Sequence, residues 1–245
     1  LILILSKQLK NIKDVSADMA QHQDKGKVIS ELMLRIMSSL VLGPLVLLLI
    51  YFGSFYFEIL VIIGTIILTV EWWHMTNKKA VWLFLGLFYI GAGCISLIFI
   101  RNSPLMGQET TIWLFIIIWA TDIGAYFSGK MLGGPKLAPM ISPQKTWSGL
   151  IGGMAFAALA GISVNYFIHI ENLLGLMVIS SFLGAVCQSG DLLESYAKRY
   201  FNVKNSGKIL PGHGGLLDRV DGLLAASLLV AGFQWVKGKG ILEWF

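Results

Sequence analysis

Long apolar runs separated by short polar loops limit what this chain can fold into. Seven runs approach or reach the length that a helix needs to cross the roughly 30 Å hydrocarbon core of a bilayer. They cover residues 36–51, 57–72, 80–100, 110–128, 150–168, 173–189 and 216–236. The first two are short and are separated by Gly53 and Ser54, so they form either two spans or one span with a re-entrant pair, and we favour two spans. The pattern predicts an all-α, polytopic integral membrane protein with about seven transmembrane helices.

The composition excludes an ordinary soluble domain, because 56% of the 245 residues are hydrophobic and only 13% are charged. Cys94 and Cys187 both lie in apolar runs, which predicts buried packing residues and neither a disulfide nor a cysteine-based metal site. The net charge of +5 is scattered over several loops and favours contact with anionic lipid headgroups and phosphates. The sequence shows no nucleic-acid motif, and we expect no nucleic-acid partner.

The second apolar run ends in a group of residues that is typical of a membrane surface. Glu71 and His74 flank the tryptophans Trp72 and Trp73. Tryptophan is enriched where hydrocarbon meets the headgroups. We therefore expect both ionisable residues to be interfacial, and His74 to be a polar surface residue rather than a ligand.

The stretch from Gly190 to Gly222 concentrates ionisable side chains beside apolar sequence. If its first part is helical, four polar residues share one face, because they are spaced by three or four positions. These residues are Asp191, Glu194, Ser195 and Lys198. A Glu–Lys pair one turn apart is also common on ordinary solvated helices, so this face alone does not establish a site.

The glycine-rich segment 211–215 then interrupts the helix and leads into the last apolar run. Asp218 and Asp221 lie one turn apart near the start of that run, with Arg219 between them. Exposed N–H groups at a helix start suit an anion, and carboxylates beside them suit a divalent cation that bridges to it. Dipole stabilisation would also explain Asp218 by itself, but the convergence of these groups favours a site.

A second polar region begins inside the fourth apolar run. Asp122 is an ionisable residue at membrane depth, which indicates either a function or a packing role through a basic partner. The following loop, residues 129–153, is rich in glycine, proline, lysine and hydroxyl residues. Such groups bind phosphates by charge and by hydrogen bonds, and we expect this of Lys130, Lys136, Ser142, Lys145 and Thr146.

Together the two regions resemble the signature of the phosphatidate cytidylyltransferases, also called CDP-diacylglycerol synthases. The C-terminal part of the resemblance reads Ser195-x-x-Lys198-Arg199, then Lys204, then Pro211-x-His213-Gly214-Gly215-x-x-Asp218-Arg219-x-Asp221. The earlier part reads Asp122-x-Gly124-Ala125-Tyr126, followed by Lys136-Leu137-x-Pro139-x-x-Ser142-Pro143-x-Lys145-Thr146-x-x-Gly149. Three residues depart from the family pattern: Asn205, Gln144 and Ser148 stand where an aspartate, a lysine and a glutamate are usual.

The resemblance implies that the protein transfers a cytidylyl group from CTP to phosphatidate, giving CDP-diacylglycerol and pyrophosphate for phospholipid biosynthesis. It implies Mg²⁺ as the cofactor, CTP and membrane lipids as partners, and a homodimer as a family-level expectation. The metal ligands would be Asp191, Asp218 and Asp221, with Asp122 closing the site. The catalytic residues would be Asp218, Asp221, Asp191, Lys198 and Arg219. The substrate-binding residues would be Ser195, Arg199, Lys204, His213, Gly214, Gly215, Lys136, Ser142, Lys145 and Thr146.

Charge distribution predicts the topology. Residues 1–35 are mostly polar, and we expect no signal peptide of ordinary form in them. We expect these residues to be a cytoplasmic tail. The transmembrane catalytic domain would then comprise residues 36–245. Seven spans then place sixteen of the nineteen Lys and Arg residues on the cytoplasmic side and leave Arg101, Lys237 and Lys239 opposite. We expect a multi-pass protein of the cell inner membrane whose active-site loops face the cytoplasm.

Two other classes of protein remain as alternatives. A cation-coupled transporter also carries acids such as Asp122 in the membrane, although paired halves with discontinuous spans are not evident here. A CTP-dependent lipid-alcohol kinase would use similar metal and phosphate groups, but it would release CDP, whereas the synthase releases pyrophosphate.

Overall fold

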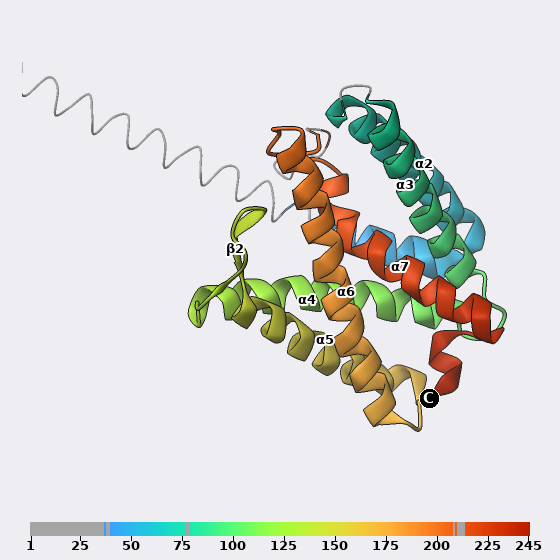
Figure 1. Ribbon diagram of the computed structural model, residues 1–245. Helices are drawn as coiled ribbons and strands as arrows, with labels where there is room; N and C mark the ends of the chain where they lie inside the picture. The colour runs from blue at the N-terminus through green and yellow to red at the C-terminus, as the bar shows by residue number, and fades with distance from the viewer. Residues whose placement is uncertain (1–36, 38–39, 77–78, 208, 210–213) are drawn as a thin grey trace, which may run out of the picture. The chain divides into compact units, whose positions relative to one another are not determined.

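The structure is a computed structural model that describes residues 37, 40–76, 79–207, 209 and 214–245 (Figure 1). The chain divides into two compact units, of which residues 1–44 and 211–213 form one and the remainder forms the other. Most of the first unit, including the predicted tail and His213, lies outside the described residues. The long helices and the strands given below belong to the second unit.

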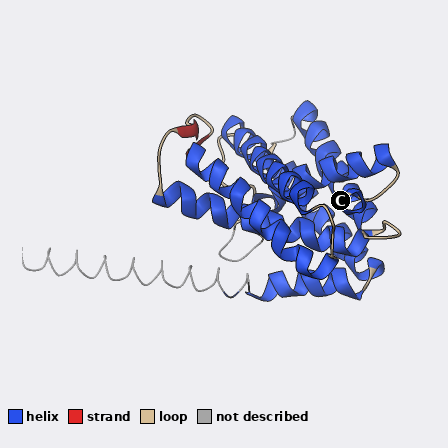
Figure 2. Ribbon diagram, turned by 90° about the horizontal axis from the view of Figure 1, so that it is seen from below, coloured by secondary structure: helices blue, strands red, loops and turns tan. Residues whose placement is uncertain are grey.

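Among the described residues, six helices are long and apolar enough to cross a membrane. They are α2 (Ser54–Met75), α3 (Ala80–Arg101), α4 (Gly107–Met131), α5 (Trp147–Ile168), α6 (Leu173–Tyr200) and α7 (Leu217–Lys237). These helices correspond to the last six predicted runs, and Figure 2 shows that helix dominates the described chain. The shorter apolar helix Leu40–Phe52 overlaps the first predicted run. The prediction of an all-α, polytopic membrane protein is confirmed.

A small antiparallel hairpin lies where the sequence predicts only a loop. Strands β1 (Lys136–Ala138) and β2 (Ser142–Thr146) pair Lys136 with Thr146 and Ala138 with Ser142. A two-stranded hairpin is marginally stable alone. This one is tied to the start of α5, because the Thr146 side chain accepts a hydrogen bond from the Gly149 N–H at 3.1 Å and caps that helix. The 3₁₀ helix η1 (Ile241–Trp244) follows α7.

Helices α6 and α7 cross so closely that glycine is required at the contact. A Cβ atom on Gly190 would lie 2.7 Å from the main-chain oxygen of Asp221, and one on Gly222 would overlap the Cys187 sulfur. Because neither glycine has a side chain, the two backbones approach directly. The crossing therefore places Asp191, the residue after Gly190, beside Asp221, the residue before Gly222.

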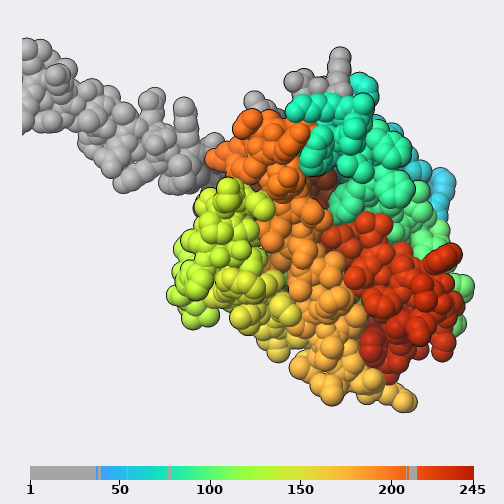
Figure 3. Space-filling model, viewed as in Figure 1, coloured from blue at the N-terminus to red at the C-terminus, as the bar shows by residue number. Residues whose placement is uncertain are grey.

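Successive helices alternate in direction, so the end of α2, the hairpin, the end of α6 and the start of α7 gather on one side of this unit (Figure 1). The Arg199 side chain near the end of α6 donates from Nε to the main-chain oxygen of Ile141 in the hairpin at 3.1 Å. The hairpin and this end of α6 are also neighbours in the space-filling view (Figure 3). The polar sequence regions therefore meet at one end of the helices.

Candidate active site

Three carboxylates converge where α6 and α7 cross. One oxygen each from Asp191, Glu194 and Asp221 lies within 4.8 Å of the others. Asp191 and Glu194 are almost one turn apart on α6, and the glycine contact brings Asp221 to them from α7. The Tyr89 hydroxyl on α3 donates to the main-chain oxygen of Asp221 at 3.3 Å, which holds that turn from a third helix. Carboxylates gathered this closely suit a divalent cation with oxygen ligands.

Lys198 forms the centre of a buried ionic network beside this group. Its ammonium group pairs with Glu194 one turn earlier in α6 and lies 2.7 Å from Oδ1 of Asp218 on α7. The three side chains are 12%, 5% and 11% exposed, respectively. Helix α6 is continuous through this segment, so the predicted polar helical face is confirmed.

Asp218 has protein partners for both carboxylate oxygens. Oδ1 accepts from Lys198, and Oδ2 accepts from the main-chain N–H groups of Ser206 and Gly215, each at 3.1 Å. Asp218 is thus one turn from Asp221 but turned toward Lys198 and the segment that precedes α7. Its contacts hold that segment and that lysine in place.

The hairpin contributes Lys145, which links it to α6. The Lys145 ammonium group lies 2.6 Å from Oδ2 of Asp191 and donates to the main-chain oxygen of Gln188 at 3.3 Å. Ser195, one turn after Asp191, donates to its Oδ1 at 3.3 Å. Asp191 therefore belongs both to the carboxylate group and to a contact with the hairpin.

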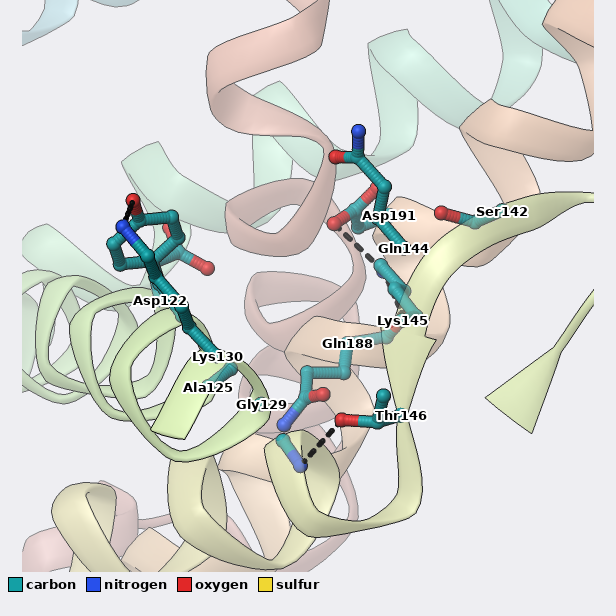
Figure 4. A pocket seen from close by; sticks show the side chains of 12 residues that line it. Asp122, Ala125, Gly129, Lys130, Ser142, Gln144, Lys145, Thr146, Gln188 and Asp191 are labelled. Atoms are coloured by element: carbon teal, nitrogen blue, oxygen red, sulfur yellow. Dashed lines mark hydrogen bonds and ion pairs between the residues drawn. The ribbon is translucent and has the colours of Figure 1, made fainter. Parts of the chain in front are cut away.

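A cavity of about 480 Å³ opens beside Asp191, between α4, β2, α5 and α6. Figure 4 shows Lys145 and Asp191 along one side of it and Asp122 and Lys130 along the other. The predicted residues that line this cavity are Asp122, Ser142, Lys145, Thr146 and Asp191. The two predicted regions, separated along the chain, therefore form one polar site.

Other predicted residues lie around the edge of this centre. The side chains of Lys136, Lys204 and Arg219 are exposed, and Arg199 contacts the hairpin turn. Gly214 has φ of +89°, a backbone conformation that favours glycine. The Gly215 N–H is already paired with Asp218. His213 lies outside the described residues, so a role for it stays a prediction.

The three departures from the family pattern occupy different places. Gln144 lines the cavity. Ser148 lies at the start of α5, where its hydroxyl is 2.9 Å from that of Thr146. Asn205 is exposed near Gly214. Of the three, Gln144 is therefore the one that faces the space expected to receive substrate.

Sequence reasoning left two carboxylates out of the predicted site. Glu194 lies on the polar helical face that the sequence predicts, three residues after Asp191. The sequence offered no reason to include it among the metal ligands. Glu71 is predicted to be interfacial, whereas the structure buries it against the start of α7, where it accepts hydrogen bonds from the N–H groups of Leu216 and Leu217. An ionisable residue within an apolar run, the signal that selected Asp122, also marks Glu71.

Fold and site together are those of a multi-pass membrane protein with an acidic, lysine-lined centre at one end of its helices. A sequence model of the cytidylyltransferase family matches residues 76–236, more than half of the chain. The chain belongs to the cytidylyltransferase family, which confirms the predicted resemblance.

Individual relatives support this assignment. A protein from Rickettsia bellii named phosphatidate cytidylyltransferase is 41% identical over 214 residues, which are 84% of this chain and 92% of the relative. A protein of the same name from Brucella suis is 48% identical over 167 residues, which are 68% of this chain. The aligned region spans 61% of the Brucella protein, less than two thirds of its length.

Proposed function

We propose that this protein transfers a cytidylyl group from CTP to phosphatidate, releasing pyrophosphate and forming CDP-diacylglycerol for phospholipid biosynthesis. The observation that carries the proposal is the position of the carboxylate group, which adjoins a lysine-lined cavity at one end of helices long enough to span a membrane. A water-soluble nucleotide and a membrane lipid can both approach such a place. The names of the relatives agree with this reaction.

The carboxylate group fits Mg²⁺, which prefers oxygen ligands and usually keeps one or two carboxylates together with substrate phosphates. Asp191, Glu194 and Asp221 would hold the ion, and Asp122 lines the adjoining cavity. Bound Mg²⁺ would neutralise negative charge on the nucleotide phosphates. Asp218 contributes by holding Lys198, which offsets the charge of the neighbouring carboxylates.

In the proposed reaction an oxygen of the phosphatidate phosphate attacks the α-phosphorus of CTP. A new oxygen–phosphorus bond forms while the bond from the α-phosphorus to the oxygen of the departing pyrophosphate breaks. The attacking oxygen is already ionised, so no strong general base is needed. The task of the protein is to align two anions and to stabilise their charge.

The basic residues of the site are arranged for this task. Lys145 lies on the cavity wall, where its ammonium group can donate hydrogen bonds to nucleotide phosphate oxygens. Ser142 and Thr146 supply hydroxyl groups on the same strand. Arg199, Lys204, Arg219 and Lys136 lie nearer the surface and add positive charge along the approach of the anionic substrates.

The proposal includes a location and an assembly state. We propose that the active-site end faces the cytoplasm, which the distribution of Lys and Arg supports, and that the protein lies in the cell inner membrane. A homodimer is the assembly that the family resemblance suggests. Light scattering of the purified protein in detergent, corrected for bound detergent, tests the dimer, and labelling of single cysteines from either side of the membrane tests the orientation.

The reaction is tested with purified protein in detergent, radiolabelled CTP, phosphatidate and Mg²⁺. We expect lipid-extractable cytidine and pyrophosphate to appear in equal amounts and both to vanish when EDTA is added. Release of CDP with a phosphorylated lipid would instead indicate a lipid kinase. Absence of all these products from folded protein would reject the proposal.

A further inference from the structure

Glu71, near the end of α2, contacts the start of α7, which lies about 145 residues later in the sequence. Its side chain is buried, with the residue only 3% exposed. One carboxylate oxygen, Oε1, accepts the N–H of Leu216, and the other, Oε2, accepts the N–H of Leu217, each at 2.9 Å. N–H groups at a helix start have no partner within the helix and attract negative charge. The protein thus supplies its own anion at this position.

The same carboxylate also contacts the segment that precedes α7. The Ser206 hydroxyl donates to Oε2 of Glu71 at 3.4 Å. Asp218 accepts the N–H groups of Ser206 and Gly215 from the other direction. A side chain on Gly207 or Gly215 would collide with or crowd the Glu71 carboxylate. Two carboxylates therefore hold Ser206 and Gly215, and the space at Gly207 and Gly215 admits no larger residue.

The position of α7 determines where the carboxylates of Asp218 and Asp221 lie. Asp218 and Asp221 lie in the first turns of this helix, immediately after the N–H groups that Glu71 accepts. A small displacement of the helix start would carry both aspartates away from Lys198 and Asp191. Misplacement of about 1 Å in an active site can reduce the rate about a hundredfold.

We propose that Glu71 is a positioning residue for cytidylyl transfer. It fixes the start of α7 and Ser206, so that Asp218 meets Lys198 and Asp221 joins the carboxylate group. It acts through these residues and touches no substrate. The effect on turnover rests on the proposed function, whereas the effect on local structure does not.

The test compares Glu71→Gln with Glu58→Gln in the full chain. The first variant preserves size but removes the charge and places an amide group against N–H donors. The control residue, Glu58, lies on the same helix nearer its other end and accepts a hydrogen bond from the side chain of the exposed Asn102. Two quantities are measured in detergent: amide hydrogen exchange of metal-free protein, and kcat and KM of the Mg²⁺-supplied enzyme.

We expect Glu71→Gln to raise amide exchange at least about tenfold in peptides covering residues 206–220 and to leave the other helices protected. We expect kcat to fall by about tenfold to a hundredfold, with KM for phosphatidate changed by less than about twofold. Glu58→Gln should match the wild type in both measurements. Glu71→Asp, which keeps the charge on a shorter side chain, should recover part of the kcat.

The proposal is overturned if exchange in residues 206–220 and kcat both match the wild type. It is also overturned if exchange rises throughout the chain while kcat per folded molecule is unchanged, because that pattern indicates a purely structural role. If Glu71→Gln does not fold, Glu71→Asp carries the same test, and wild-type exchange and kcat in that variant reject the proposal. An inactive wild type would reject the proposed function, while the exchange measurement would still decide whether Glu71 holds α7.

Discussion

Two lysines pair with carboxylates at this site, and their surroundings differ. Lys145, on the hairpin, pairs with Asp191 at the cavity wall, where the two side chains are 18% and 39% exposed. Lys198, inside α6, lies between Glu194 and Asp218, and these three side chains are at most 12% exposed. Exposed ion pairs contribute little to stability, whereas removal of one partner from a buried network is costly.

In the proposed reaction, this difference in exposure would separate the residues that bind substrate from those that stabilise the fold. The Lys145–Asp191 pair, called the open pair below, lines the cavity, so in the proposed reaction both partners would exchange their mutual contact for a phosphate and a cation. Lys198 has no such freedom, since its two carboxylates come from different helices and are held by their own contacts. Substitutions at the open pair should therefore affect kinetics, and substitutions in the buried network should affect stability.

Asp191→Asn should have the largest effect, because it removes charge from the carboxylate group and from the open pair together. We expect the rate of CDP-diacylglycerol formation to fall by about a thousandfold or more, as metal-assisted charge stabilisation supplies several kcal/mol. The melting temperature should change little because Asp191 is 39% exposed. Initial rates over a range of Mg²⁺ concentrations and a thermal melt measure both quantities. Glu171→Gln, in an exposed loop away from the site, is the control, and wild-type rates in Asp191→Asn would refute the proposed centre.

Lys198→Met should have the largest effect on stability. It leaves Glu194 and Asp218 without their shared cation, and loss of one partner from a buried ion pair costs about 3–5 kcal/mol. Thermal and denaturant unfolding in detergent measure the loss. Adding Glu194→Gln should restore part of the stability because it removes one of the stranded charges. A single variant as stable as the wild type would show that the buried network is not structural.

Lys145→Ala should raise KM for CTP while leaving stability nearly unchanged. Loss of a hydrogen bond to a charged group costs about 1.5–3 kcal/mol, which corresponds to roughly a tenfold to hundredfold weaker interaction. Steady-state kinetics at saturating phosphatidate, together with a thermal melt, provide the measurement. Lys239→Ala, at the opposite end of the helices, is the matched control. If the variant melts early but keeps its KM for CTP, the distinction between the open and buried pairs is wrong.

Ser195→Ala should have the smallest effect. The Ser195 hydroxyl orients Asp191 through a 3.3 Å hydrogen bond, which is worth about 1 kcal/mol. We expect kcat/KM to fall by about fivefold. The exposed hydroxyl of Ser189 on the same helix donates to the main-chain oxygen of Ala185 one turn earlier at 2.9 Å, so Ser189→Ala serves as the control. Equal kinetics in the two variants would show that Asp191 needs no orientation from Ser195.

Local periodicity was sufficient to predict part of this site. Asp191, Glu194 and Lys198 share a face because residues three or four apart on a helix always do, whatever the helix packs against. The position of Asp221 at the start of the last apolar run and that of Lys145 in the polar loop also predicted these two residues, but neither position indicated that Lys145 pairs with Asp191 or that Lys198 separates two carboxylates. Those contacts depend on how α6, α7 and the hairpin are placed.

Local sequence patterns do not predict two other features, the contact of Glu71 with α7 and the hairpin. Glu71 and Leu217 are 146 positions apart in the sequence, and no pattern near either residue predicts their contact. The hairpin lacks the alternating apolar residues that mark strands, because its second strand reads Ser-Pro-Gln-Lys-Thr. Its position depends on the link between Thr146 and α5, a tertiary contact. Helical spans are predictable because the bilayer imposes them, whereas these polar contacts arise only in the folded chain.

The length of α6 bears on how a lipid reaches the site. The helix has 28 residues, about 42 Å, whereas a hydrocarbon core is about 30 Å thick. Asp191 lies 18 residues after Leu173, about 27 Å along the axis. In a helix along the bilayer normal that enters the hydrocarbon at Leu173, this carboxylate lies about 3 Å inside the opposite edge of the hydrocarbon, next to the layer of lipid phosphates. A phosphatidate molecule that diffuses sideways in its leaflet would meet the reaction centre without being lifted out of the bilayer.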